Sequence, residues 1–273
     1  MRPPTAVTAR VADPGTAPSL HLTGATGFLG SELARLRPDA TSERVEVRDA
    51  RAVSSLLRRL RPEVVIHTAY LQQGEGAWET TVDGAANVAR AARSVGARLV
   101  HLSTDVVFDG RKGRPYVEDD LPSPVTDYGR AKAEAERLVA AEHPEALVVR
   151  TSLIVGGPGR EPSRHERAAL DPASTFFEDE LRSPIQVGDL AAALLELAEL
   201  GVSGPLHVAG EDAVSRAELA ELVAGHPVRR TPAPAGRPLD CTLDSSLAQA
   251  LVGTRLRGVR EVFAGSERGK LPA

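Results

Sequence analysis

A short strand pattern near the start of the chain runs directly into a glycine turn and then into a helix pattern. The strand is LHLT at positions 20–23, the turn is GATGFLG at 24–30, and SELARL follows as the helix. Glycines here permit a tight turn, close approach of the backbone to a pyrophosphate, and close packing of helix on strand. The N–H groups and positive dipole end of the helix favour phosphate. The pattern predicts a dinucleotide-binding turn, with an incidental glycine turn as the alternative.

The later segments extend this unit into a sheet. Strand patterns occupy 44–48, 64–69, 99–103, 146–151, 183–187 and 206–209, and helix patterns occupy 52–60, 80–95, the stretch from 128, 190–200 and 217–224. Continuous apolar strands are typical of parallel sheets that are covered on both faces. Strands that alternate with helices give right-handed parallel connections. The chain is therefore predicted to be an α/β protein with a doubly wound parallel sheet.

Turn and capping residues complete the expected layout. The stretch 156–175 is rich in turn residues, so we expect a lid, a substrate loop or a disordered loop there. Asp189 and Ser215 are expected to cap the helices that follow them, and Gly96 to end the helix before it.

Composition narrows the partners and the compartment. The 273 residues are 42% apolar and 26% charged, and the net charge of −4 favours neither nucleic acid nor an anionic membrane. No apolar run approaches the ~20 residues of a membrane span. The single cysteine, Cys241, excludes an internal disulfide and a multi-thiolate metal site. We expect a cytoplasmic protein whose residues 1–18 form a flexible tail without the apolar block of a secretory signal.

The helix that starts at Tyr128 carries a candidate acid. Tyr128 and Lys132 are four positions apart, so their side chains share one helix face. A neighbouring cation favours the phenolate and lowers the pKa of a tyrosine from about 10, towards the range in which a general acid works. Lysine is rare here, since the chain has only three. The alternative interpretation is a surface pair at an exposed helix start.

Several candidate residues stand at the carboxyl ends of predicted strands. Gly24, Ala69 and Thr104 are three of them, and Ser103 precedes Thr104. In parallel α/β sheets these ends share one edge, where ligands gather. The helix of Tyr128 brings its pair to the same edge. For Ser103 and Thr104 the alternative is that their hydroxyls cap backbone groups.

Asp49 has two interpretations. It lies nineteen positions after Gly30, so it can end the second strand and bind a ribose hydroxyl. Alternatively, the second strand is lost and Asp49 ends the third strand, near an adenine. The stretch between Gly30 and the next helix is too short to decide between these two interpretations of Asp49. The sequence therefore does not decide between NAD and NADP either.

Four histidines lie inside different predicted strands. They are His21, His67, His101 and His207. No metal-ligand spacing such as H-E-x-x-H accompanies them, so we interpret them as hydrogen-bonded histidines of the sheet and expect no metal.

The order of these motifs resembles a known family. T-G-A-T-G-F-L-G, R-P-E-V-V-I-H-T-A, L-V-H-L-S-T-D-V-V-F-D-G, Y-G-R-A-K, V-V-R-T-S and R-S-P-I-Q-V-G-D-L-A are together similar to extended short-chain dehydrogenases/reductases, in the RmlD-like, sugar nucleotide-binding dTDP-4-dehydrorhamnose reductase branch. The resemblance runs from about 20 to about 210. Its most specific parts are S-T-D-x-V-F-D-G at 103–110 and S-P-x-x-x-x-D-L-A at 183–191.

The resemblance implies a Rossmann-type sheet with a smaller C-terminal substrate lobe. The NAD(P)-binding Rossmann domain would comprise 19–155 plus 185–210, and the substrate-binding lobe 156–184 plus 211–273. The cofactor would be NADP or NAD, with NADPH slightly preferred. The cofactor-binding residues would be Gly24, Thr26, Gly27, Phe28, Leu29, Gly30, Asp49, Ala50, Thr68, Ala69, Tyr70, Ser103, Tyr128, Lys132, Thr151 and Ser152.

The resemblance also implies a reaction. Thr104, Tyr128 and Lys132 match the catalytic positions: Tyr128 donates a proton, Lys132 tunes it and binds the nicotinamide ribose, and Thr104 binds the carbonyl oxygen. The substrate would contact Thr104, Asp105, Val106, Leu153 and Arg182.

Three positions depart from the family pattern. Val106 replaces the usual aromatic residue after S-T-D, Leu153 replaces the usual Trp after R-T-S, and Asp83 replaces an Asn. Because two aromatic residues on the substrate side are absent, we expect the substrate to be either a nucleotide-sugar or a related ketone.

We therefore expect an NAD(P)H-dependent reductase of a keto-sugar or related ketone. Its partner would be a small carbonyl compound such as a nucleotide-sugar. We expect it to bind neither nucleic acid nor a membrane, and the sequence is compatible with a homodimer. One alternative is a non-catalytic NAD(P)-binding regulatory subunit of another enzyme. The other is an NAD-retaining epimerase or dehydratase, for which Asp105 is a candidate acid but no Glu follows it.

Overall fold

The computed structural model describes residues 17–264, which divide into two compact units. The first unit comprises the described residues up to Thr104 together with Asp127–Arg150 and Ala191–Leu206, and the second comprises the remainder. The predicted N-terminal tail, 1–18, lies almost entirely outside the described residues. The domain boundaries predicted from the sequence stay a prediction.

A five-stranded parallel sheet forms the centre of the first unit, as predicted. Its strands, in spatial order, are β1 (Leu20–Thr23), β2 (Val64–His67), β3 (Arg98–Thr104), β4 (Leu147–Thr151) and β9 (Gly204–His207). In register, Thr23 lies opposite His67, and His67 opposite His101. The carboxyl ends of β1, β2 and β3 therefore align at one edge.

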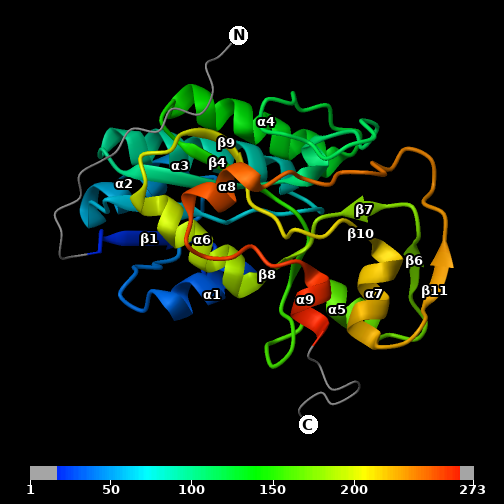
Figure 1. Ribbon diagram of the computed structural model, residues 1–273. Coiled ribbons are helices and arrows are strands. Elements are labelled where there is room, and N and C mark those ends of the chain that lie inside the picture. Colours follow the sequence, from blue (N-terminus) through cyan, green and yellow to red (C-terminus); the bar gives the residue numbers. More distant parts are fainter. Residues whose placement is uncertain (1–16, 265–273) are drawn as a thin grey trace. The chain divides into compact units, whose positions relative to one another are not determined.

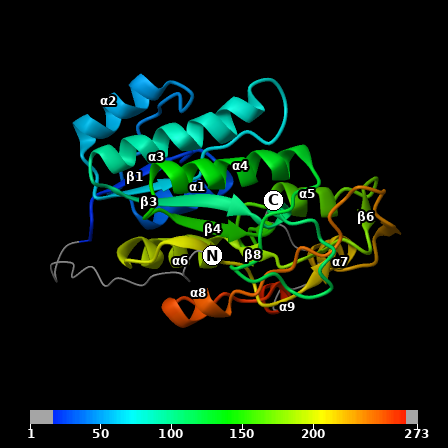
Figure 2. The same ribbon diagram turned by 90° about the horizontal axis from the view of Figure 1, so that it is seen from above.

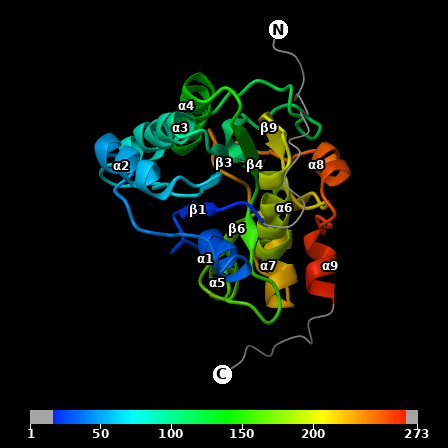
Figure 3. The same ribbon diagram turned by 90° about the vertical axis from the view of Figure 1, so that its left-hand side faces the viewer.

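Helices cover both faces of this sheet. They are α1 (Phe28–Leu36), α2 (Ala50–Leu60), α3 (Gly84–Ser94), α4 (Asp127–Glu142) and α6 (Val187–Glu199). Figures 2 and 3 show α2, α3 and α4 side by side on one face, with α1 and α6 on the other. The inner face of α3 is mostly alanine, and small side chains let it pack between its two neighbours. The α/β doubly wound prediction is confirmed.

The predicted strand at 44–48 is wrong. Val47 is buried in the core, but the backbone carbonyls of Val47 and Arg48 accept hydrogen bonds from the Asn87 side chain rather than from a neighbouring strand. In the described part of the chain, the edge of β1 that faces away from β2 is paired by an isolated bridge between His21 and Thr41. The alternation of apolar and polar residues at 44–48 correctly indicated a buried valine. The segment that carries this valine is irregular and not a strand.

The predicted helix at 80–95 has two parts. A π-helical turn, η1 (Glu79–Asp83), precedes α3. A Cβ on Gly84 would lie 2.7 Å from a methyl carbon of Val47, so a larger residue where α3 begins would displace the buried Val47 side chain. Gly96 has a φ of +73°, which suits glycine after the end of α3.

The second unit is built from short elements. They are η2 (Asp105–Val107), β5 (Ile154–Val155), α5 (Arg164–Ala169), β6 (Thr175–Phe177), β7 (Leu181–Arg182), β8 (Ile185–Gln186), β10 (Val214–Ser215), α7 (Arg216–Ala224), β11 (Arg229–Thr231), α8 (Ser246–Leu251) and α9 (Val259–Ala264). Three two-stranded sheets pair β7 with β10, β6 with β11 and β5 with β8. In Figure 1, α7 lies beside α5 and α9.

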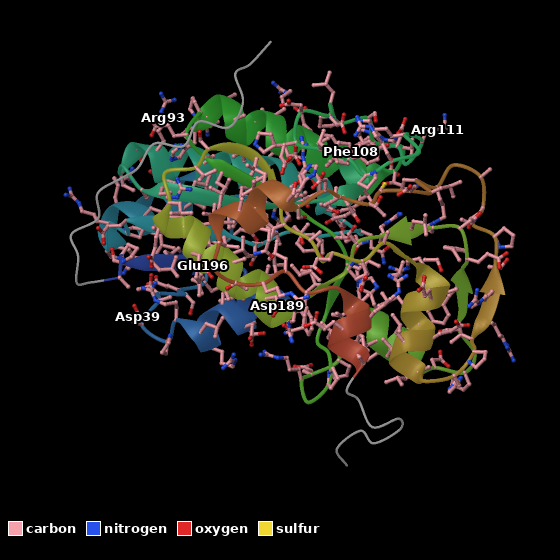
Figure 4. All side chains as sticks on the ribbon, viewed as in Figure 1. Asp39, Arg93, Phe108, Arg111, Asp189 and Glu196 are labelled. Atoms are coloured by element: carbon pink, nitrogen blue, oxygen red, sulfur yellow. The ribbon has the colours of Figure 1, made fainter. Side chains whose placement is uncertain are left out.

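Two expectations for the second unit need correction. The stretch 156–175 contains α5, which a capping box of Ser163 and Glu166 initiates. Asp189, labelled in Figure 4, lies in the first turn of α6, where its carboxylate accepts hydrogen bonds of 2.8 and 2.9 Å from Arg257. The Gln186 side chain accepts from the first N–H groups of that helix instead. Ser215 caps α7 as predicted.

Within the described residues, none of the helices is long and apolar enough to cross a membrane.

The glycine turn gives a stability test. A Cβ on Gly30 would lie 2.1 Å from the Gly24 carbonyl oxygen, whereas a Cβ on Gly27 would lie 3.3 Å from the same atom. Gly30→Ala should therefore force the backbone apart and lower the free energy of unfolding by about 2 kcal/mol more than Gly27→Ala does. Urea denaturation of both variants without cofactor measures this difference. Equal losses would contradict the packing described.

Candidate active site

The glycine turn brings the ends of β1 and β2 into direct contact. Gly24 has a φ of +78°, and a Cβ there would lie 2.7 Å from both the Ala69 backbone nitrogen and the Thr68 hydroxyl oxygen. The Thr68 hydroxyl in turn donates to the Thr23 carbonyl at 2.9 Å. The predicted cofactor positions at 24, 68 and 69 therefore lie together in the first unit.

Helix α1 starts without a side-chain cap. Among residues 17–264, no side chain bonds its first N–H groups, and its first turn contains no acidic residue. In contrast, Asp49 caps α2 and Ser215 caps α7. Thr26 and Gly27 are exposed, while the Leu29 side chain is buried and leaves only the backbone of Leu29 to a ligand. An uncapped helix start after a glycine turn fits a phosphate group of a dinucleotide.

Neither interpretation of Asp49 as a strand end survives. Asp49 follows an irregular segment and is the N-cap of α2, where Oδ1 accepts from the N–H groups of Arg51 and Ala52. Ala50 is the first residue of that helix. The roles of Asp49 and Ala50 in binding ribose or adenine stay predictions.

Tyr128 and Lys132 meet at a third residue, Tyr70. The Lys132 Nζ lies 5.5 Å from the centroid of the Tyr70 ring, and the rings of Tyr70 and Tyr128 are 5.8 Å apart. Nζ also donates to the Leu102 carbonyl oxygen at 2.6 Å. Lys132 is only 3% exposed, whereas Tyr70 is 41% exposed. The interpretation of Tyr128 and Lys132 as a surface pair is therefore wrong for the lysine.

Burial changes the acidity of Lys132. Loss of solvation lowers the pKa of its ammonium from 10.5 to about 8, and the Glu136 carboxylate opposes part of this shift. Strongly perturbed lysines next to other polar groups are typical of functional sites. Lys132 is therefore a candidate for chemistry near neutral pH.

Thr104 and Ser103 end β3 next to this lysine. Thr104 lies two positions after Leu102, whose carbonyl binds Lys132. The Ser103 hydroxyl is buried and donates to Glu136 Oε1 at 2.5 Å. The Thr104 backbone therefore lies at the same strand end as the Lys132 ammonium. The Ser103 hydroxyl is already hydrogen-bonded to Glu136.

The buried histidines of the sheet are partly paired. His67 Nδ1 lies 2.6 Å from the Thr23 hydroxyl, and the His67 and His101 rings stack at 5.3 Å. Among the described residues neither ring nitrogen of His101 has a hydrogen-bond partner, so the expectation of fully bonded histidines is wrong there. Burial and the Lys132 charge lower the pKa of His67 to about 3, and they lower the pKa of His101 as well. Both rings are neutral.

The remaining predicted residues lie in the second unit. Ser152 donates to Asp105 at 2.6 Å, and Arg182, which is 1% exposed, lies 3.6 Å from the same carboxylate and 3.1 Å from Glu180. Thr151 donates to the Val208 carbonyl. Asp105, Ser152 and Arg182 are thus gathered into one buried polar cluster. Val106 and Leu153 are half-buried.

Sequence reasoning missed Glu136 and Glu180. Glu136 stands four positions after Lys132, so the spacing that relates Tyr128 to Lys132 repeats once more. That repeat was the signal for a polar stripe on α4. No comparable signal marks Glu180.

Comparison with known proteins identifies the family. The family model described as the RmlD substrate binding domain matches residues 19–265. The chain belongs to the RmlD family. A dTDP-4-dehydrorhamnose reductase of Mycobacterium tuberculosis (strain H37Rv) is 39% identical over 224 residues, which cover 74% of this chain and 73% of the relative.

Two further proteins are similar to this chain, one in sequence and one in fold. The methionine adenosyltransferase 2 subunit beta of Rattus norvegicus is 28% identical, over 86% of this chain and 83% of its own. The crystal structure of the Bacillus anthracis dTDP-4-dehydrorhamnose reductase in complex with NADP has a TM-score of 0.80 at 24% identity, over 91% of this chain and 98% of that one. The latter likeness confirms the fold of this RmlD family member.

Replacing Lys132 by Met should stabilise the protein at pH 7. The shift of the Lys132 pKa from 10.5 to about 8 opposes folding by about 3 kcal/mol. Losing the bond to Leu102 costs about 1 kcal/mol. The free energy of unfolding should therefore rise by about 2 kcal/mol in urea denaturation.

The same shift fixes how this difference depends on pH. Between pH 8 and 10.5 the unfolded wild type retains the Lys132 proton while the folded wild type loses it, so wild-type stability rises with pH in this window. The advantage of Lys132→Met should shrink across it. Lys112→Met is the control, because Lys112 is paired with Asp120 near the surface. A constant advantage from pH 7 to 10.5 would contradict a buried charge at Lys132.

Proposed function

We propose that this RmlD family member is an NAD(P)H-dependent reductase of a keto-sugar, as in dTDP-4-dehydrorhamnose reductase, or of a related ketone. The observation that carries the proposal is the buried Lys132 ammonium, which lies over Tyr70 beside Tyr128 at the carboxyl end of β3. The uncapped helix α1 and its glycine turn, in the same unit, support dinucleotide binding.

Residues at the edge of the sheet would hold the cofactor. The exposed Gly27 would leave room for its pyrophosphate, Gly24 and Gly30 would hold the turn in shape through close packing, and the N–H groups at the start of α1 would bind the phosphate charge. Asp49 would bind on the adenosine side. When bound, the reduced nicotinamide supplies a hydride to the carbonyl carbon.

The residues of the chain handle the proton and the developing charge. Tyr128 donates its hydroxyl proton to the carbonyl oxygen, and Thr104 stabilises that oxygen by donating a hydrogen bond. Lys132 contributes a positive charge that favours the resulting phenolate. Because the Lys132 side chain is almost completely shielded from water, its charge acts in a low-dielectric environment where it is more effective than at the surface.

The names of the relatives support the proposed substrate class. Keto-sugar nucleotides are the substrates that the name of the M. tuberculosis relative indicates. Val106 and Leu153 stand where the family usually has aromatic residues, so a smaller or differently shaped ketone is the second substrate class. Asp105 and Arg182 are the polar residues proposed to bind it.

A regulatory subunit is the second candidate function. It is favoured by the likeness to the methionine adenosyltransferase 2 subunit beta. The buried Lys132 charge weighs against it, since a protein without catalysis gains nothing from a charge that lowers its stability. Stoichiometric capture of an enzyme partner, with no turnover of a panel of keto-sugars and cyclic ketones, would favour the regulatory role.

Tyr128→Phe tests the proton donor. The variant keeps the ring that packs at 5.8 Å from Tyr70 but loses the hydroxyl. Turnover should fall by about 10² to 10⁴, while NADH or NADPH should still raise the melting temperature as in wild type. The assignment is wrong if Tyr128→Phe reduces the substrate as fast as wild type.

The pH dependence tests Lys132. Its pKa of about 8 means that the ammonium is lost as pH rises through that value. The value of kcat/KM should therefore fall about tenfold per unit above pH 8. In Lys132→Arg the charge persists to pH above 12. Any residual activity should therefore lack the fall of kcat/KM above pH 8, which is the basic limb of the pH profile. A limb near pH 8 that is unchanged in Lys132→Arg would assign it to another group.

A further inference from the structure

A buried carboxylate lies one helical turn beyond Lys132. Glu136 is 8% exposed and faces the sheet from α4. Ser103 of β3 donates to its Oε1 at 2.5 Å. Arg150 of β4, which is 4% exposed, donates from Nε at 3.1 and 3.2 Å and from Nη2 at 2.9 Å. One side chain thus joins a helix to the carboxyl-terminal parts of two adjacent strands.

These contacts connect Glu136 to the proposed catalytic groups. Ser103 immediately precedes Thr104, and Lys132 precedes Glu136 by one turn of the same helix. Lys132 itself donates to the carbonyl of Leu102, the residue before Ser103. A shift of α4 along β3 would therefore have to break both attachments at once.

We propose that Glu136 is a positioning residue, which fixes α4 against β3 and β4 and sets the electrostatic environment of Lys132. This inference rests on the proposed function. Glu136 touches neither substrate nor cofactor, and it acts through Lys132 and Ser103.

Stability alone does not account for a carboxylate at this position. The neighbouring inward residues of α4, such as Ala135 and Val139, are apolar and packed in the core. A buried ion pair replaced by apolar residues of similar volume is often as stable or more stable. A leucine at 136 with an apolar residue at 150 would satisfy packing, so the pair of Glu136 and Arg150 serves orientation and charge.

The charged and titratable groups around Lys132 come from several elements. Glu136 lies on the same helix, and it is the carboxylate that raises the pKa of Lys132 against the effect of burial. His67 on β2 and His101 on β3 are neutral, because burial and the Lys132 charge lower their pKa values. Tyr70 presents its ring to Nζ. Among these groups, Glu136 is the negative charge that holds Lys132 in its ammonium form.

Titration of the lysine itself tests the proposal. The chain has only three lysines, so ¹³C-lysine labelling gives three side-chain signals, and Lys132→Met assigns the relevant one. The variants are Glu136→Gln and the matched control Glu134→Gln. Glu134 lies on the same helix but pairs with Arg137 at the surface. The pKa of Lys132 should fall by about one unit in Glu136→Gln and stay at the wild-type value in Glu134→Gln.

A double variant separates the charge from the loss of folding stability. Glu136→Gln removes the carboxylate that pairs with the buried Arg150 guanidinium and lowers the melting temperature. Glu136→Gln combined with Arg150→Met removes both charges and should recover stability, yet its Lys132 should still titrate below wild type. A Lys132 pKa that matches wild type in the double variant would overturn the proposal.

Kinetics give the second readout. The basic limb of kcat/KM should move down by about one pH unit in both Glu136 variants, and kcat should fall more than the KM for the carbonyl substrate rises. A lower melting temperature with an unmoved limb would make Glu136 merely structural. The lysine titration needs no turnover, so a wild type inactive on every carbonyl would refute the proposed function and leave the titration to decide on Glu136.

Discussion

A positive charge buried beneath the carboxyl end of a parallel sheet is the constraint around which the first unit is arranged. The Lys132 ammonium has lost nearly all its contact with water, so it needs compensation from the protein. The Leu102 carbonyl, the Tyr70 ring and the Glu136 carboxylate provide it from a strand, a loop and the helix itself. The residual cost appears as the lowered pKa of Lys132.

The sheet topology makes this arrangement accessible to a ligand. In a parallel sheet the carboxyl ends of β1, β2 and β3 lie at one edge, where Gly24 contacts Thr68 and Ala69 and where Thr104 ends its strand. Helix α1 starts at this edge without a cap, whereas α2 and α7 satisfy their first N–H groups internally. Within residues 17–264, the first N–H groups of α1 have no side-chain cap, and such donors at the edge of the sheet suit a cofactor with phosphates.

Much of the sheet and of its ligand-binding edge could be predicted from the sequence, because apolar runs indicate burial and glycine spacing indicates backbone geometry. The strands around Val65 and Leu99, the turn at Gly24 and the face of α4 were predictable for that reason. The irregular conformation of the segment at Val47 was not predictable. Alternating apolar residues indicate burial, but they do not show that the Asn87 side chain, and not a neighbouring strand, binds the Val47 carbonyl. Nor was Glu136, since the sequence shows an acidic residue on a helix but not the Arg150 that meets it from β4.

The choice of lysine at 132 is itself a physical argument for chemistry. Three of the 33 basic residues are lysines, so arginine is the usual cation of this chain. A guanidinium is planar, requires several acceptors and stays charged at any working pH. An ammonium is compact enough to bond one carbonyl under a tyrosine ring, and burial can bring its pKa to about 8. A group that only had to hold a helix against a sheet would not need that property, whereas a group that adjusts a neighbouring phenol near neutral pH does.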